Sequence, residues 1–462
     1  MLSFFGPGTQ HCDGITRRKV LRVGGLGFLG LMWSDWLRAR AVAANSDQRP
    51  KKASSFGKAK ACILIFNYGG PSHLDIWDLK PDAPIEIRGE FKPQSTNVPG
   101  ISITEHLPLL AKQANRYAII RSVNHIDNDH AVGTYLALTG YPHPRSRPLG
   151  TEPAASASDM PSLGSVLSKL HPPRKPVFPY VTLGTLRHLG NNDSMGQNAG
   201  CLGKVYDAFS VPTGARDTSA VRSVMGSVDS FRLAARRQML DKINRTAPAL
   251  EAMAATQTLD GFALRAYELL ASPASRHAFE LEKEPQKIRD FYGPSALAQN
   301  CLLARRLVEA GVPLVTVYSA PERDWDTHGG NFKSLKDTLL PATDRSMSAL
   351  LEDLDSRGLL EETLVVWMGD MGRTPLINKA AGRDHWSFCY SIVMAGAGVR
   401  GGQVFGSSDR SAAYPSTNPV SPADVAATLY HCLGLDPETH VTDQLGRPFV
   451  ASTGRPIQAL FG

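Results

Sequence analysis

The chain has 462 residues, of which 42% are hydrophobic and 20% charged, and its formal net charge is +7. This length and composition suit a globular protein with a large buried core. The positive charge is modest and no basic stripe with interleaved aromatic residues is present, so we expect no nucleic-acid partner. The six cysteines form no Cys-x-x-Cys pair, which argues against a disulfide scaffold or a zinc–thiolate site, although one bridge is compatible with their number.

The first 44 residues have the pattern of a twin-arginine signal peptide. Arg17 and Arg18 precede a Gly-rich apolar run from Val23 to Trp33, and Ala41-Val42-Ala43 is a small-x-small cleavage signal. The apolar run is too short to span a bilayer stably, although a single membrane anchor or a buried helix is the alternative. We therefore expect the twin-arginine export machinery as a partner and a periplasmic or cell-envelope location, or secretion.

Residues 45–60 are polar and basic and predict a linker. From residue 61 onward, short apolar runs alternate with helical patterns. The runs are continuous, as in strands covered on both faces, and they are Ala61–Tyr68, Tyr117–Val123, Pro179–Leu183, Pro313–Ser319, Thr363–Gly369 and Tyr390–Ala395. The intervening helices are expected at Ser102–Gln113, His130–Leu138, Ala296–Ala310, Lys336–Arg357 and Pro422–Leu433. This alternation predicts one α/β domain over residues 61–462, with a doubly wound, mostly parallel central sheet.

The middle of the chain, from about residue 141 to 295, departs from this alternation. Residues 141–162 are rich in Pro, Ser and Ala, and residues 185–230 are rich in Gly, Ser and Asn. We interpret the region as a largely helical or irregular insertion over one edge of the sheet, with its own helices at Ser230–Arg245 and Leu259–Ser272.

Asp and His residues gather in the loops beside the predicted strands. In open α/β sheets, ligands bind beyond the carboxyl ends of the strands, so these loops form the expected site. They contain His73 and Asp75, then His125, Asp127, Asp129 and His130, then Asp324, Asp326 and His328, and finally Asp370, Asp384 and His385. Carboxylates and neutral imidazoles suit Zn²⁺, Mn²⁺, Ca²⁺ or Mg²⁺, so the pattern predicts a divalent metal ion as cofactor.

Some of these residues are stronger ligand candidates than others. Asp326 and His328 are two apart, so on an extended segment both point the same way; alternatively, Asp326 caps a turn. Asp370 follows a glycine at the end of a buried strand and is the best single candidate. His385 beside Asp384 is either a ligand with a carboxylate behind it or a buried histidine satisfied by its neighbour.

Asp129 is expected to cap the helix that follows it, which places His130 in the first helical turn. The positive end of a helix suits phosphate or sulfate oxygens, and it also keeps an imidazole neutral and able to bind metal. Arg373 and Arg121 could make forked contacts with an oxyanion, or each could form a surface ion pair.

On these residues, the chain resembles the bacterial DUF1501 proteins, a group within the alkaline phosphatase and sulfatase superfamily that is often exported by the twin-arginine route. The resemblance covers nearly the whole mature chain. Its carriers are Gly69–Asp75 with Lys80-Pro81, His125–Gly140, Trp325–His328, Gly369–Pro375, Gly382–Trp386 and Asp443–Pro448.

The wider superfamily is visible in three segments. Leu360–Gly372 is similar to the sulfatase strand that ends in an Asp-His-Gly or Asp-Asn-Gly metal motif, which implies Asp370 as a ligand and, with Met371 in the second position, fewer ions than in alkaline phosphatase. Ser421–Leu433 resembles a late sulfatase helix that contains Asp424. His130–Gly140 keeps the spacing of the sulfatase segment Cys-x-Pro-Ser-Arg-x-x-x-x-Thr-Gly, so the resemblance places His130 at the nucleophile position.

An imidazole at that position leaves several roles open. His130 could be a metal ligand, a nucleophile or a general acid/base, or water activated by the metal could attack directly. We expect an exported metal-dependent hydrolase of small-molecule or polysaccharide phosphate or sulfate esters, with His130 and Arg373 catalytic. The expected metal ligands are Asp75, Asp326, His328, Asp370 and His385. The alternative is a catalytically degenerate, metal-dependent binding protein of the cell envelope.

Overall fold

A central sheet of eight strands organises the chain in the computed structural model, which describes residues 55–143, 155–184, 186, 195–212, 214–216, 235, 238–239, 272–319 and 324–461. In spatial order the strands are β12 (Gln403–Phe405), β4 (Tyr117–Val123), β11 (Tyr390–Ala395), β8 (Thr363–Gly369), β1 (Ala61–Asn67), β7 (Leu314–Tyr318), β5 (Val181–Leu183) and β6 (Phe209–Val211). Every neighbouring pair is parallel except those of β11, which runs antiparallel to β4 and β8. The predicted mostly parallel sheet is confirmed.

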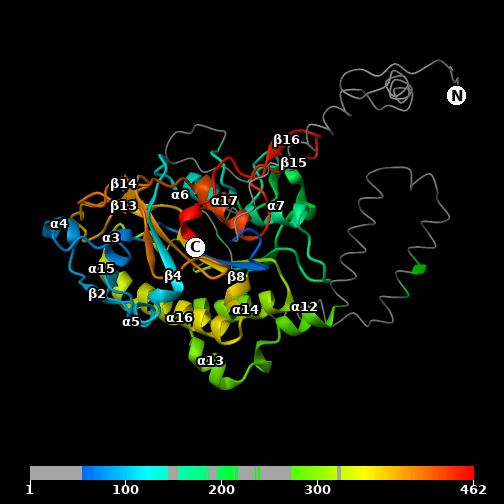
Figure 1. Cartoon of the computed structure of the whole chain (residues 1–462), viewed down its shortest axis with the longest axis horizontal. Coiled ribbons are helices and arrows are strands. Elements are labelled where there is room, and N and C mark those ends of the chain that lie inside the picture. The colour runs from blue at the N-terminus through cyan, green and yellow to red at the C-terminus, as the bar shows by residue number, and fades with distance from the viewer. Residues whose placement is uncertain are drawn as a thin grey trace, which may run out of the picture. The chain divides into compact units, whose positions relative to one another are not determined.

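Helices cover both faces of this sheet (Figure 1), as the doubly wound prediction requires. One face carries α5 (Pro108–Ala111), α13 (Gln286–Tyr292), α14 (Ala296–Ala310) and α16 (Leu340–Ser356), and the other carries α6 (His130–Thr139), α7 (Leu163–Leu170) and α17 (Pro422–Cys432). Alternate residues of β1 serve the two layers: Ile63 and Ile65 lie in one core cluster, and Leu64 and Phe66 in the other. This is why the central strands read as continuous apolar runs.

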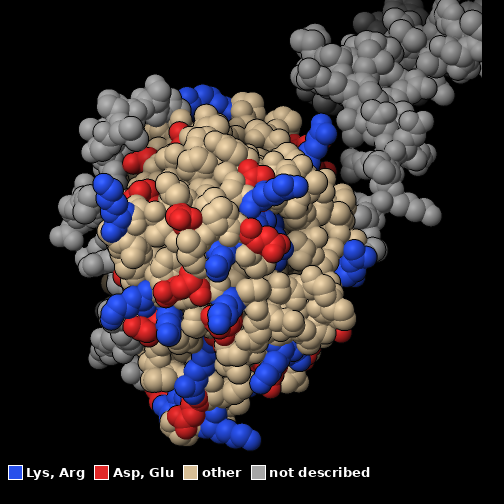
Figure 2. Space-filling view, turned by 90° about the vertical axis from the view of Figure 1, so that its left-hand side faces the viewer, with Lys and Arg blue, Asp and Glu red and all other residues tan. Residues whose placement is uncertain are grey.

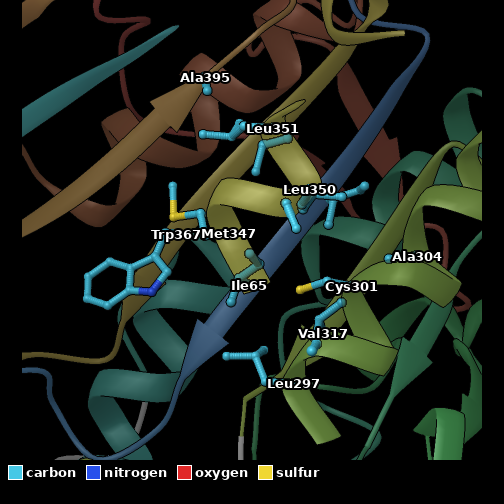
Figure 3. Packing of buried hydrophobic residues seen from close by; sticks show 14 of the residues in the cluster. Ile65, Leu297, Cys301, Ala304, Val317, Met347, Leu350, Leu351, Trp367 and Ala395 are labelled. Atoms are coloured by element: carbon cyan, nitrogen blue, oxygen red, sulfur yellow. The ribbon is translucent and has the colours of Figure 1, made fainter. Parts of the chain in front are cut away.

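Side chains of α14 and α16 fill the first of these layers. Figure 3 shows Met347, Leu350 and Leu351 of α16 beside Cys301 of α14 and Trp367 of β8. α14 begins at the capping residue Ser295, whose side chain accepts from the amide of Ala298, and it ends at Gly311 with φ 106°. A serine cap and a left-handed glycine are the expected start and stop of a helix, so these bounds match the prediction.

One predicted helix is wrong. Residues 102–113 are not a continuous helix, because Ser102–Thr104 forms β3, which pairs with β2 (Pro93–Ser95), and only Pro108–Ala111 is helical. Proline cannot donate a backbone hydrogen bond and fits only the first turn of a helix, so Pro108 starts α5 rather than continuing an earlier one. Pro341 has a related effect: α16 begins at Leu340, after a π-helical turn over Leu335–Leu339.

The region between residues 141 and 295 was predicted to lie over one edge of the sheet, but it also forms part of the sheet itself. Its described parts supply β5 and β6, the last two strands of the sheet, together with α7, α12 (Pro273–Ala278) and α13. Other short elements among the described residues include α3 (His73–Ile76), α4 (Ile85–Arg88), α15 (Asn331–Ser334), β9 (Gly372–Arg373), β10 (His385–Trp386), β13 (Ser407–Ser408), β14 (Pro415–Thr417), β15 (His440–Thr442) and β16 (Pro448–Val450).

Several predictions concern residues that the structure does not describe. The signal peptide and most of the linker fall within residues 1–54, and nearly all of the predicted helices Ser230–Arg245 and Leu259–Ser272 also lie outside the described residues. Among the residues that are described, no helix combines the length and apolarity needed to cross a bilayer. Five cysteines fall in the described part, Cys62, Cys201, Cys301, Cys389 and Cys432, and all are free and buried.

Charged side chains of both signs are interspersed on the face of the molecule in Figure 2. Acidic and basic side chains alternate there over short distances, so this face presents a mixed surface rather than a broad field of one sign.

Candidate metal centre

Three histidines converge on one carboxylate at the carboxyl edge of the sheet. The Nε2 atoms of His130, His328 and His385 lie 3.2, 3.1 and 3.3 Å from Oδ1 of Asp326. His130 starts α6 after β4, Asp326 and His328 follow β7, and His385 lies in β10. The structure therefore brings together residues from three separate loops, as expected for a site beyond the carboxyl ends of the strands.

His130, Asp326 and His385 form a group that could hold a metal ion, because each offers a ligand atom and these atoms lie within 4.8 Å of one another. His328 offers a further ligand atom at the exposed side of the group, where its Nε2 lies 3.0 Å from Nε2 of His385. The site is buried on one side and open on the other: the His130 side chain is 1% exposed, whereas that of His328 is 47% exposed.

The tautomers of the three histidines follow from what lies at Nδ1. Nδ1 of His328 is 2.6 Å from Oδ1 of Asp384, and Nδ1 of His385 is 2.8 Å from the carbonyl oxygen of Asn128. Nδ1 of His130 faces Oδ2 of Asp370. Because carboxylate and carbonyl oxygens only accept hydrogen bonds, each Nδ1 carries the hydrogen and each neutral ring keeps its lone pair at Nε2.

Three imidazole lone pairs therefore face one carboxylate oxygen, whose hydrogen-bond donor is Arg373 rather than any of the three rings. The Nε2 atoms of His328 and His385 are 3.0 Å apart, and all three Nε2 lone pairs surround the carboxylate oxygen of Asp326. A cation would satisfy this arrangement. Proteins usually orient histidine ligands in this way, with an oxygen that accepts a hydrogen bond from the other ring nitrogen. The donor set of imidazole nitrogens and one carboxylate oxygen thus fits a divalent metal ion.

The charges around His130 and Asp326 also favour a cation at this position. Burial acts to lower the pKa of His130, but the carboxylates of Asp370 and Asp326 outweigh burial and raise that pKa to about 9. Burial acts to raise the pKa of Asp326, but the adjacent imidazoles of His130 and His385 and the guanidinium of Arg373 hold it well below its usual range. The two carboxylates that raise the pKa of His130 are thus the charges that a cation at this position would neutralise.

Asp370 supports this group from behind rather than joining it. Its Oδ1 accepts a hydrogen bond from the backbone N–H of Gly69 at 3.1 Å, and its Oδ2 accepts one from Nδ1 of His130. Burial acts to raise the pKa of Asp370, and the interaction with His130 outweighs it and holds the pKa below its usual value. Asp370, the residue predicted as the best single ligand, therefore lies beside the group and holds the ring of His130.

Arg373 has its donors committed to the protein. It donates from Nε to the carbonyl of Gly70 at 2.9 Å, from Nη1 to that of Arg383 at 3.1 Å, and from Nη2 to the carbonyl of Gly69 and to Oδ1 of Asp326, the latter at 2.5 Å. The predicted oxyanion contact does not match this geometry, because a fully buried guanidinium that holds backbone and Asp326 has no free fork for a substrate. Arg373 instead positions Asp326.

Asp75 is not part of the centre, which corrects the predicted ligand set. Both of its oxygens bind the guanidinium of Arg383, at 2.8 and 2.9 Å, and Oδ2 also accepts from Ser72 and Asn331. Asp75 and Arg383 are both 0% exposed. A buried charge requires a partner, and here the arginine from the loop before His385 supplies it.

Glycines allow the loops of the centre to approach closely. A Cβ on Gly382 would lie 2.0 Å from the carbonyl oxygen of His328, and one on Gly69, whose φ is 110°, would lie 2.5 Å from the amide nitrogen of Asp326. Side chains at either position would push the loop that carries Asp326 and His328 away from the sheet edge.

The family model described as "Protein of unknown function (DUF1501)" matches residues 59–461, which include every residue of the centre. The chain belongs to the DUF1501 family. No curated protein matches it.

Similar solved structures of the DUF1501 chain include members of the alkaline phosphatase and sulfatase superfamily. They are a phosphonate monoester hydrolase from Silicibacter pomeroyi (10% identity, 87% of this chain and 76% of that chain covered, TM-score 0.39), the PsFucS1 sulfatase from a Pseudoalteromonas species (12%, 86% and 71%, 0.35) and the alkaline phosphatase of the Antarctic bacterium TAB5 (10%, 76% and 95%, 0.31). At this level of likeness, they carry no information on what the DUF1501 chain binds.

Three residues in or beside the DUF1501 centre were not predicted from the sequence. The carbonyl oxygen of Asn128 contacts Nδ1 of His385, and Arg383 binds Asp75 outside the centre. Asn378 donates to the carbonyl of His328 at 2.9 Å and to Oδ1 of Asp384 at 3.2 Å. Arg383 lies in a motif that the sequence singled out, Gly382–Trp386, but nothing local shows that its partner is Asp75, 308 residues earlier.

Proposed function

We propose that this DUF1501 protein is an exported, metal-dependent hydrolase of phosphate or sulfate esters. The observation that carries the proposal is the set of four acceptor atoms on Asp326, His130, His328 and His385, each histidine being oriented by an oxygen at Nδ1. A divalent cation bound there supplies Lewis-acid stabilisation of the ester oxyanion and activates water. Imidazole donors favour Zn²⁺ or Mn²⁺ over Ca²⁺ and Mg²⁺, which prefer oxygen.

The exposure of the histidines indicates where an ester would enter. His130 and Asp370 close the inner side of the centre, while the side chains of His328 and Asp384 are 47% and 53% exposed. An ester would therefore approach from the side of His328, with its reacting group against the inner residues Asp326 and His385. The same open side accepts either a small molecule or one end of a polysaccharide.

The test starts with elemental analysis of the purified chain after refolding or expression with Zn²⁺, Mn²⁺, Ca²⁺ and Mg²⁺. Aryl phosphates, phosphodiesters and aryl sulfates are then screened with the wild type, Asp326→Ala, His385→Ala and the control His440→Ala, in which an exposed histidine outside the centre is removed. We expect a stoichiometric metal ion and turnover in the wild type and the control, with both lost in the two centre variants. A wild type that binds none of the four ions contradicts the proposal.

A metal-dependent binding protein is the second candidate function. It is favoured by His130, which stands where the superfamily has its nucleophile and which is enclosed by Asp370 and Asp326 instead of facing solvent. The same screen separates the two functions: a bound metal ion without turnover of any ester class supports the binding protein.

Export by the twin-arginine route is part of the proposal and rests on Arg17-Arg18 and the apolar run that follows. Residues 1–60 fused to a reporter that is active only outside the cytoplasm should export it. Replacement of both arginines by lysine should abolish export, and continued export of the lysine variant would contradict this route.

A further inference from the structure

We infer that His130 binds the cation of the centre rather than attacking the substrate, so that the hydrolysis uses water directly and forms no covalent bond to the protein. The inference deepens the proposed function and rests on it. It also decides between the roles that the sequence leaves open for a histidine at the nucleophile position.

The ring of His130 is held in one orientation. Asp129 caps α6 and accepts hydrogen bonds from the amides of Ala131 and Val132 at 2.9 and 3.2 Å, which fixes the first helical turn. The imidazole then packs edge to face with Tyr68 and with His385, at centroid distances of 5.5 and 4.2 Å. The packing directs Nδ1 toward Asp370 and Nε2 toward Asp326.

Only Nε2 of His130 has a lone pair to offer, and it is not open to a substrate. Nδ1 carries the hydrogen that Asp370 accepts. Nε2 is buried and has no hydrogen-bond partner among the described residues, since the atom it faces, 3.2 Å away on Asp326, is an acceptor. A nucleophile needs a lone pair that faces the substrate, whereas a buried lone pair directed at the other ligand atoms is the geometry of a ligand.

Asp370 fixes the tautomer of His130 that leaves the lone pair at Nε2. It accepts from Gly69 through Oδ1 and from His130 through Oδ2, so both of its oxygens face N–H donors. The carboxylate thereby selects the tautomer in which Nε2 binds metal, and it increases the basicity of that nitrogen. In a nucleophilic role, the same hydrogen bond would leave Nε2 to attack through the position that Asp326 and His385 occupy.

The consequence is a single displacement. The water oxygen forms its bond to phosphorus or sulfur while the bond to the leaving oxygen breaks, and the leaving oxygen keeps that electron pair. One proton of the water ends on the leaving alcohol, and the other stays on the phosphate or sulfate. One displacement inverts the configuration at phosphorus, whereas a covalent histidine intermediate would retain it through two.

The first test is metal binding, measured without reference to activity. Affinity for Zn²⁺ is determined by competition with a chelator, and the coordination by the absorption spectrum of the Co²⁺ form, for the wild type, His130→Gln, His130→Ala, Asp370→Asn and the control His440→Ala. We expect both His130 variants and Asp370→Asn to lose at least tenfold in affinity and to shift the Co²⁺ bands, while the control matches the wild type. Circular dichroism in chelator confirms that each variant is folded, and Asp370→Asn keeps the test open if the His130 variants are not.

The second test uses the unmodified chain. Stoichiometric protein is mixed with an aryl ester, quenched at high pH, where phosphohistidine survives, and examined by mass spectrometry, and inversion or retention is read from a chiral phosphate ester. An adduct at His130, or His130 variants that bind Zn²⁺ as tightly as the wild type, overturns the inference and leaves the proposed hydrolase intact. A wild type that binds metal through His130 without turning over any ester overturns the hydrolase and leaves the ligand assignment.

Discussion

Asp370 and His130 are 240 residues apart in the sequence and share a hydrogen bond in the buried half of the centre. Asp370 ends β8 and His130 begins α6, so the bond joins the middle of the sheet to the helix layer above it. The same carboxylate also accepts from Gly69, just after β1, so one side chain links three loops and fixes the tautomer of His130.

Replacing the Asp370 carboxylate by an amide of the same shape should weaken metal binding. In Asp370→Asn one of the two N–H donors, from Gly69 or His130, must face the amide NH₂, and the ring of His130 can relieve the clash only by giving up its metal-binding tautomer. We expect the Zn²⁺ affinity to fall by about 10- to 100-fold, which is the usual effect of changing a residue that orients a ligand. Chelator competition measures it, with the exposed Asp82→Asn as control.

Asn378 joins the two loops of the exposed side. Its Oδ1 accepts from the amides of Ala380 and Gly382 at 2.9 and 3.0 Å, while its Nδ2 donates to His328 and Asp384. Asn378→Ala removes all four bonds, so we expect a loss of about 1–3 kcal/mol in the free energy of unfolding and roughly tenfold in metal affinity. Asn378→Asp keeps both acceptor contacts and should recover part of the stability but little of the affinity. Lys379→Ala, on the exposed neighbour, should change neither, and an equal loss there would contradict a positioning role.

Breaking the Asp75–Arg383 pair should lower the free energy of unfolding but leave the metal affinity unchanged. Asp75→Ala leaves a guanidinium buried without its partner, which costs about 3–5 kcal/mol of unfolding free energy. Metal affinity per folded molecule should stay near the wild-type value, because Asp75 does not touch the centre. Urea denaturation measures the first effect. The exposed pair Lys60–Glu362, with side chains 73% and 46% exposed, is the control, and its removal should change stability by less than about 1 kcal/mol.

Acid should destabilise the fold partly through His73. This residue is 1% exposed and its Nε2 donates to the carbonyl of Ala412 at 2.9 Å, and burial holds its pKa below the ordinary value. The unfolded state then binds the proton more readily, so the contribution of His73 is fully present above about pH 6.5 and is lost as the pH falls toward the lower folded pKa. His73→Gln should reduce the dependence of unfolding free energy on pH below 6.5 by up to one proton, whereas the exposed His440→Gln should not alter it.

Local patterns account for most of the sheet and its helices. β4, β8 and β11 have the predicted bounds because each is a continuous apolar run between polar or glycine residues, and α14 lies between its serine cap and Gly311. The failure at residues 102–113 has an equally local reason, since Pro108 forbids the helix that the apolar spacing suggested. β6 was missed because Ser210 interrupts its three residues and it lies in a stretch rich in Gly, Ser and Asn, so no continuous apolar run marks it.

Sequence patterns were enough to predict which loops meet, because parallel strands place their carboxyl ends at one edge. Asp326, His328, His385, His130 and Asp370 do lie there. These patterns did not predict which acidic side chain faces which basic one. Asp75 binds Arg383 and Asp370 binds His130, across 308 and 240 residues, and only the packed loops decide these pairings. The reason is physical: periodicity reports the local conformation of the backbone, whereas a ligand, a ligand's support and a buried ion pair differ by a few ångströms between side chains that are distant in the chain.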